Sequence, residues 1–120
     1  MTRKIIAVAA AVSALALLLG GTATAAPVTV VGKVGPGYTI TLTVGGKKVK
    51  KLKAGASYRF VISDRSSDHD FRLKGPGTSK VLSGEGFTGQ KATVLKLRRG
   101  THRFYCAPHS DEMQGRFAVA

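Results

Sequence analysis

The chain has 120 residues, which predicts a single domain with a core of modest size. It carries 19 lysine and arginine residues against 6 aspartate and glutamate residues, a formal net charge of +13. It has one cysteine, which excludes a disulfide within the chain and leaves a free thiol, an intermolecular bridge or a metal ligand.

The N-terminal segment has the pattern of a secretory signal peptide. Arg3 and Lys4 precede an uncharged, largely apolar run over residues 5–19, and small residues at 23–25 form a cleavage motif. The run is shorter than the roughly 20 residues of a spanning helix, so an uncleaved anchor is the less favoured alternative. We predict a signal peptide over residues 1–25 and a mature domain over 26–120. The mature domain is expected to be secreted or extracytoplasmic (periplasmic or cell-envelope), with no membrane span.

The charge of the mature domain bears on its partners. Without Arg3 and Lys4, 17 basic residues remain against 6 acidic residues, a net charge of +11. Export and the lack of a dense basic helix argue against nucleic acid. The charge predicts either a well-solvated surface or attraction to an acidic redox partner protein or an anionic cell envelope. We expect a monomer.

The first half of the mature chain is typical of short β-strands separated by glycine turns. Residues 28–34 are rich in valine, and residues 38–44 alternate apolar side chains with threonine. Residues 47–53 contain five lysines, which is typical of an edge strand or an exposed loop. Residues 58–62 alternate again and predict a further strand with one buried face.

The next segments combine a histidine with strand periodicity. His69, Phe71 and Leu73 recur at period two after a polar connection, so His69 is expected to point inward where a strand begins. A lone inward histidine is more often a structural residue than a ligand. Residues 75–89 hold five glycines and predict a long irregular connection, and residues 92–97 predict another strand.

The last predicted strands lead to the cysteine. His102, Phe104 and Cys106 share one face of a strand, and Phe117 and Val119 close the domain. About seven short strands with no helical period predict an all-β fold, a two-sheet β-sandwich.

Side chains that bind soft metals gather around the cysteine. Cys106, His109 and Met113 lie within eight residues, so one loop can supply a thiolate, an imidazole and a thioether. His69, 37 positions upstream of the cysteine, can add a second imidazole from another strand. This set suits copper, which accepts sulfur and nitrogen ligands as both Cu(I) and Cu(II).

Three other interpretations stay open. Zinc accepts a thiolate and two imidazoles but gains little from a thioether. A catalytic cysteine with His109 as its base is less favoured, because no oxyanion donor is apparent in the sequence. A sandwich that binds nothing and serves adhesion or structure is the least favoured.

Two segments resemble the cupredoxin family, in particular small secreted plastocyanin-like domains of bacteria. They are residues 68–77, with a His-x-Phe motif, and residues 104–115, with Cys-x-x-His followed by Met-x-Gly. The resemblance covers most of residues 27–120 and implies a Greek-key β-sandwich with one type 1 copper ion at one end. The ligands that it implies are His69, Cys106 and His109 in the equatorial plane and Met113 on the axis.

The family resemblance implies one-electron transfer, with His109 as the electron port, rather than enzymatic turnover. Copper binding, delivery or envelope copper homeostasis without electron transfer is the alternative. Asp70 departs from the family, which often has asparagine there to tie the first histidine strand to the cysteine loop. Asp111 and Glu112 lie inside the ligand loop and could compete with Met113. His102 is expected to be a packing residue and not a ligand.

Overall fold

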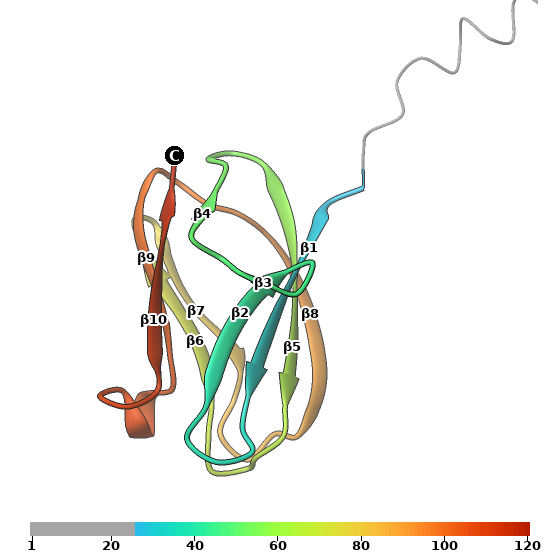
Figure 1. Cartoon of the computed structure of the whole chain (residues 1–120), viewed down its shortest axis with the longest axis vertical. Coiled ribbons are helices and arrows are strands. Elements are labelled where there is room, and N and C mark those ends of the chain that lie inside the picture. The colour runs from blue at the N-terminus through green and yellow to red at the C-terminus, as the bar shows by residue number, and fades with distance from the viewer. Residues whose placement is uncertain (1–25) are drawn as a thin grey trace, which may run out of the picture.

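The computed structural model describes residues 26–120, which form two β-sheets packed face to face (Figure 1). The predicted signal peptide and its cleavage site lie outside these residues. No helix among the described residues is long and apolar enough to span a membrane. The elements in chain order are β1 (Val28–Val34), β2 (Ile40–Val44), β3 (Lys47–Lys48), β4 (Lys51–Leu52), β5 (Ser57–Asp64), β6 (Phe71–Gly75), β7 (Thr78–Ser83), β8 (Gly89–Lys96), β9 (Gly100–Tyr105), the 3-10 turn η1 (Ala107–His109) and β10 (Gln114–Val119).

Each sheet has five strands, in the orders β3-β2-β1-β5-β8 and β4-β10-β9-β6-β7. The sheets are mixed, because β1 runs parallel to β5 and β4 runs parallel to β10, whereas the other pairs are antiparallel. This architecture confirms the predicted two-sheet sandwich. The estimate of about seven strands was too low, because β3 and β4 have two residues each and β7 escaped the sequence pattern.

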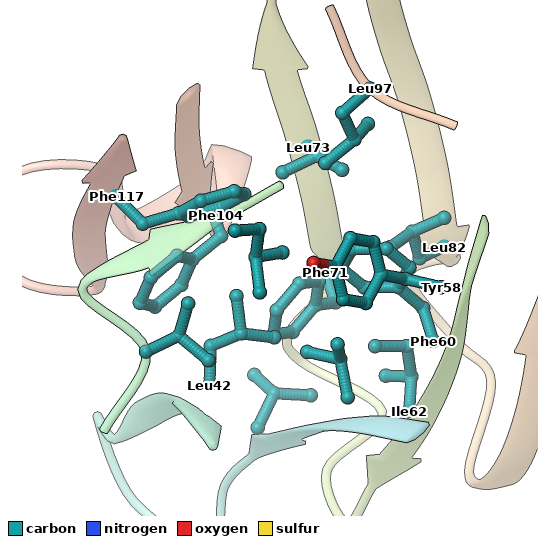
Figure 2. Close-up of a cluster of buried hydrophobic side chains, with 14 of the residues drawn as sticks. Leu42, Tyr58, Phe60, Ile62, Phe71, Leu73, Leu82, Leu97, Phe104 and Phe117 are labelled. Carbon is teal, nitrogen blue, oxygen red and sulfur yellow. The ribbon is translucent and has the colours of Figure 1, made fainter. Parts of the chain in front are cut away.

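The alternating segments bury one face, as predicted. In β5, every second side chain from Tyr58 to Asp64 is buried. The rings of Phe71 and Phe104, which come from adjacent strands β6 and β9, stack with centroids 5.8 Å apart at 6°. Figure 2 shows these rings within the apolar layer between the sheets. This layer fixes the strand ends from which the histidine at 69 and the cysteine at 106 project.

The prediction of one long irregular connection over residues 75–89 was wrong in part, because β7 lies within this segment. β7 pairs with β6 at an edge of the second sheet, so most of its side chains face solvent and only Leu82 and Ser83 are buried. An exposed edge strand lacks the alternation that marks a half-buried one. Ser83 also donates a hydrogen bond to Asp64, the last residue of β5, over 2.9 Å, so Asp64 belongs to the sheet and not to the polar connection after it.

The connections divide between the two ends of the sandwich (Figure 1). One end, named here the site end because His69 and Cys106 lie there, carries the β1–β2, β5–β6, β7–β8 and β9–β10 connections. The other end, named here the basic end because its connections contain lysine and arginine but no acidic residue, carries the β2–β5, β6–β7 and β8–β9 connections, and the C-terminus lies there. The lysine-rich segment 47–53 provides an edge strand to each sheet, β3 to one and β4 to the other, as its lysines predicted.

Candidate metal centre

Cys106 follows directly after β9 and continues its inward face. His102 and Phe104 on that face are buried, and Cys106 is fully buried as well. The thiol therefore lies inside the sandwich at the site end, because the alternation of β9 carries it there.

A compact loop after the cysteine brings the next two predicted ligands back to it. The backbone N–H of His109 donates to the carbonyl of Cys106 over 3.2 Å, and the N–H of Met113 donates to the carbonyl of His109 over 2.8 Å. The N–H of Cys106 donates to the carbonyl of Met113 over 3.0 Å, which closes the loop. Met113 is fully buried, whereas His109 is half-buried.

His69 reaches the same place from the connection that precedes β6. Its Nε2 lies 2.8 Å from the carbonyl oxygen of Gly37, which is an acceptor, so Nε2 carries the hydrogen and Nδ1 is free to act as a ligand. Nδ1 of His69 lies 3.1 Å from Nδ1 of His109 and 3.8 Å from Sγ of Cys106. The Sγ atom of Cys106 is 3.7 Å from Nδ1 of His109.

Three of the four predicted ligand residues therefore converge. The candidate donor atoms of His69, Cys106 and His109 all lie within 4.8 Å of one another. Two imidazole nitrogens and one thiol at this spacing form a cluster suited to a copper ion, since copper prefers this mixture of nitrogen and soft sulfur donors. Met113 is buried on the same loop, and its role as axial ligand stays a prediction.

Asp70 links the histidine segment to the cysteine loop. Its Oδ1 accepts a 2.7 Å hydrogen bond from the backbone N–H of Ala107, and its Oδ2 accepts one of 2.7 Å from Nε of Arg72. The carboxylate is almost fully buried, and its hydrogen bond and charge raise the pKa of Arg72. Asp70 thus makes the connection that the resemblance assigns to asparagine at this position.

Cys106 is a buried thiol beside two imidazole rings. Burial raises the pKa of the thiol, although hydrogen bonds from the backbone of Asp70 and His109 oppose part of this effect. A buried thiol with a raised pKa has little thiolate at neutral pH unless a cation replaces its proton. The position of the thiol between two imidazole nitrogens supplies the donor set that such a cation needs.

Tyr38 lies against both histidines and was not recognised from the sequence as part of the site. Its ring centroid is 4.9 Å from that of His109, edge-on at 79°, and 5.7 Å from that of His69. The sequence placed Tyr38 at the start of an alternating strand, but β2 begins at Ile40, and Tyr38 belongs to the β1–β2 connection. The one indication available was an aromatic residue directly after a Gly-Pro-Gly turn.

The remaining predicted features occupy the places expected of packing and surface residues. Asp111 and Glu112 are exposed whereas Met113 is buried, so the two acids face solvent on the outside of the loop. His102 stacks on Phe117 with ring centroids 5.5 Å apart, at the other end of β9. It is a packing residue, as expected, and lies outside the cluster.

No family model matches the chain, and no curated protein matches its sequence. Solved structures do match. The copper protein rusticyanin aligns with 19% identity over 81% of this chain and 80% of that chain, with a TM-score of 0.57. A second rusticyanin structure, from Thiobacillus ferrooxidans, gives 22% identity over 81% and 79% and a TM-score of 0.56.

Auracyanin A, a "blue" copper protein from the green thermophilic photosynthetic bacterium Chloroflexus aurantiacus, aligns with 16% identity over 79% of this chain and 100% of that chain, with a TM-score of 0.49. At these low sequence identities, structural similarity supports a conclusion about the fold alone. That conclusion rests on the rusticyanin matches, which have the higher TM-scores. They confirm the architecture that the sequence motifs indicated: the chain has the cupredoxin fold.

Proposed function

We propose that this protein is a one-electron carrier that holds a single copper ion between His69, Cys106 and His109, with Met113 as a weaker fourth ligand. The convergence of two imidazole nitrogens and one thiol within 4.8 Å supports this proposal most strongly. When bound, copper supplies the redox chemistry by alternating between Cu(I) and Cu(II).

The chain holds the donor atoms in place with contacts that do not depend on the metal. The Gly37 carbonyl orients the ring of His69, and Asp70 ties the histidine segment to the N–H of Ala107. The loop closes through the backbone of Cys106 and Met113. Because these contacts fix the ligands beforehand, little rearrangement is expected when an electron arrives or leaves.

His109 is the proposed electron port. Its ring is half-buried, and the neighbouring side chains of Ala107 and Pro108 are exposed. An acidic redox partner protein or an anionic cell envelope is the partner that the net charge favours. The N-terminal pattern supports export after cleavage near Ala25 or Ala26.

Copper delivery is the second candidate, and one feature favours it. A polar cleft at the site end is lined by residues that include His69, His109, Asp68 and Glu85, so both histidines border a surface from which an ion can be exchanged. A delivery protein must release copper readily, whereas an electron carrier must retain it through both oxidation states.

Adding Cu(II) to the purified protein tests the proposal. We expect one copper ion per chain, an intense visible absorption from thiolate bonded to Cu(II), and reversible bleaching by a one-electron reductant. A colourless protein that binds zinc more tightly than copper would contradict the copper site. Fast loss of copper to a chelator, without reversible reduction, would instead favour delivery.

Replacing Tyr38 tests whether its ring protects the site. An aromatic pair contributes about 0.5–1.5 kcal/mol, so losing the closer contact, with His109, in Tyr38→Ala should release copper to a chelator roughly two- to twelvefold faster. Tyr38→Phe keeps the ring and should release copper at nearly the unmodified rate. Stopped-flow measurement of chelator capture compares the three proteins. Equal rates in all three would show that Tyr38 does not limit exchange.

A further inference from the structure

The charges of the described chain are divided between the two ends of the sandwich. Every acidic residue lies at the site end, in the segments 64–70, 84–88 and 111–112. The connections at the basic end, residues 45–56, 76–77 and 97–99, contain seven basic residues and no acidic residue. The acidic residues are therefore concentrated at the site end, and the connections at the basic end carry basic residues alone, which the net charge of the domain does not reveal.

Five of the seven basic residues belong to the segment 47–53, named here the lysine run, and its backbone is held firmly. The N–H of Val49 donates to the carbonyl of Leu42 over 3.0 Å, and the N–H of Lys53 donates to the hydroxyl of Tyr58 over 2.8 Å. Between them, β4 pairs with β10. The run is therefore an ordered platform for its ammonium groups and not a loose loop.

The lysine run borders an open cleft of about 500 Å³. Lysines line the cleft, and its floor is made by the buried side chains of Val49, Leu52 and Tyr58. Within residues 26–120 the one ion pair joins Arg72 to Asp70, so no carboxylate lies within ion-pairing distance of the lysines of the run. Several lysine side chains thus border one hollow without an ion-pair partner, and the C-terminal residue Ala120 lies beside Lys51 and Lys53.

Protection of sheet edges does not account for this concentration. Lysine on an edge strand discourages pairing with another chain, and long exposed edges need it most. Here β3 and β4 have two residues each. The longer edge strands β7 and β8, of six and eight residues, carry one and two lysines respectively and leave Val81 and Val94 exposed. The shortest edge strands, β3 and β4, thus lie in the segment with the most lysines. Binding of a ligand explains these lysines better than protection of a strand edge from pairing with another chain does.

We infer that the basic end binds a linear polyanion with repeating phosphate groups. A chain of phosphates can lie along the lysine run and meet several ammonium groups at once, with release of the cations that were condensed on the polyanion. A membrane surface fits less well, because Val28 is the one large exposed apolar side chain that borders the cleft in the described part of the chain. This inference does not depend on the proposed copper chemistry.

Binding at the lysine run does not use the three side chains of the metal cluster. His69, Cys106 and His109 lie at the site end, whereas the run pairs with the last residues of β2 and, through β4, with the last residues of β10. Lys48 reaches furthest toward the site end, since it borders a hollow with Ile40 and Gln114. A polyanion along the run therefore leaves the donor atoms unoccupied.

Binding of inorganic polyphosphate tests the inference with two variants of equal net charge. The first replaces the five lysines of the run, at positions 47, 48, 50, 51 and 53, with glutamine. The control replaces five exposed basic residues on other elements with glutamine, at positions 33, 59, 65, 80 and 116. At 50 mM salt we expect the first variant to bind at least about 100-fold more weakly than the unmodified protein, and the control to lose less than about fivefold. Thermal unfolding establishes that both variants are folded.

Lysine acetylation of the unmodified protein gives an independent readout that needs no variant. Polyphosphate should protect Lys47, Lys48 and Lys51 from acetylation while Lys33 and Lys80 stay reactive. Equal weakening in the two variants, or uniform protection, would show that net charge alone attracts the polyanion and would overturn the inference. Binding to phosphatidylglycerol vesicles without binding to polyphosphate would overturn it too, since the ligand would then be a membrane.

Discussion

Replacing Cys106 with serine should abolish the intense visible absorption of the copper-loaded protein. The absorption requires a thiolate bonded to Cu(II), and an alcohol oxygen cannot replace the sulfur. The sandwich should stay folded, because serine fits the space and burying an unpaired hydroxyl costs only about 1–3 kcal/mol. Visible absorption with the copper stoichiometry, together with far-ultraviolet circular dichroism, measures both outcomes.

Met113→Leu is the matched control for the serine variant. It removes a buried sulfur from the same loop but leaves the thiolate and both imidazoles, so strong absorption should persist with a changed reduction potential. Intense colour in the Cys106→Ser protein would exclude Cys106 from the site. Loss of colour in both variants would mean that the loop, rather than the thiolate itself, had been disrupted.

Asp70→Ala should destabilise the metal-free protein strongly for a single substitution. It removes the acceptor of the Ala107 N–H, a charged hydrogen bond of 2.7 Å in a buried place. Losing such a bond costs about 2 kcal/mol. For a domain of this size that lowers the midpoint of thermal unfolding by about 10 °C. Calorimetry of the metal-free protein measures it.

Asp70→Asn separates the two functions of the carboxylate. The amide oxygen can still accept the hydrogen bond from Ala107, but the amide group cannot pair with the charge of Arg72. We therefore expect less than half of the shift seen with alanine. Arg72→Ala should lower the midpoint more than asparagine does, because it leaves the buried carboxylate of Asp70 without its counter-charge. If asparagine and alanine lower the midpoint equally, the link between the histidine segment and the cysteine loop does not explain the stability.

Much of the candidate site could be predicted because its chemistry is local in sequence. Cys106, His109 and Met113 fall on one loop, and the alternation through Phe104 places the cysteine on the inner face. The same period-two rule predicted that His69 points inward, although β6 begins two residues later, at Phe71. Spacing and periodicity thus brought together the residues that the structure places within 4.8 Å.

The features that the sequence did not reveal depend on contacts between distant segments. Tyr38 meets the histidines only because the β1–β2 connection folds over the β5–β6 and β9–β10 connections at the site end. β7 was missed because most of its side chains face solvent and its sequence shows no alternation. The separation of basic and acidic residues between the two ends was missed because the net charge does not say where the charged residues lie. Only the topology shows which connections share an end of the sandwich.

The position of β10 has a consequence for biosynthesis. This last strand lies between β4 and β9, and its neighbour β4 is more than 60 positions earlier in the chain. A nascent chain that emerges from its N-terminus cannot complete the second sheet until residues 114–119 are available. Until then the backbone partner of Cys106 at Met113 is missing, and the thiol is open to oxidation or to pairing with a second chain. The loop around the cysteine is therefore completed late, and the interval between synthesis and closure of the sheet is when the cysteine is most vulnerable.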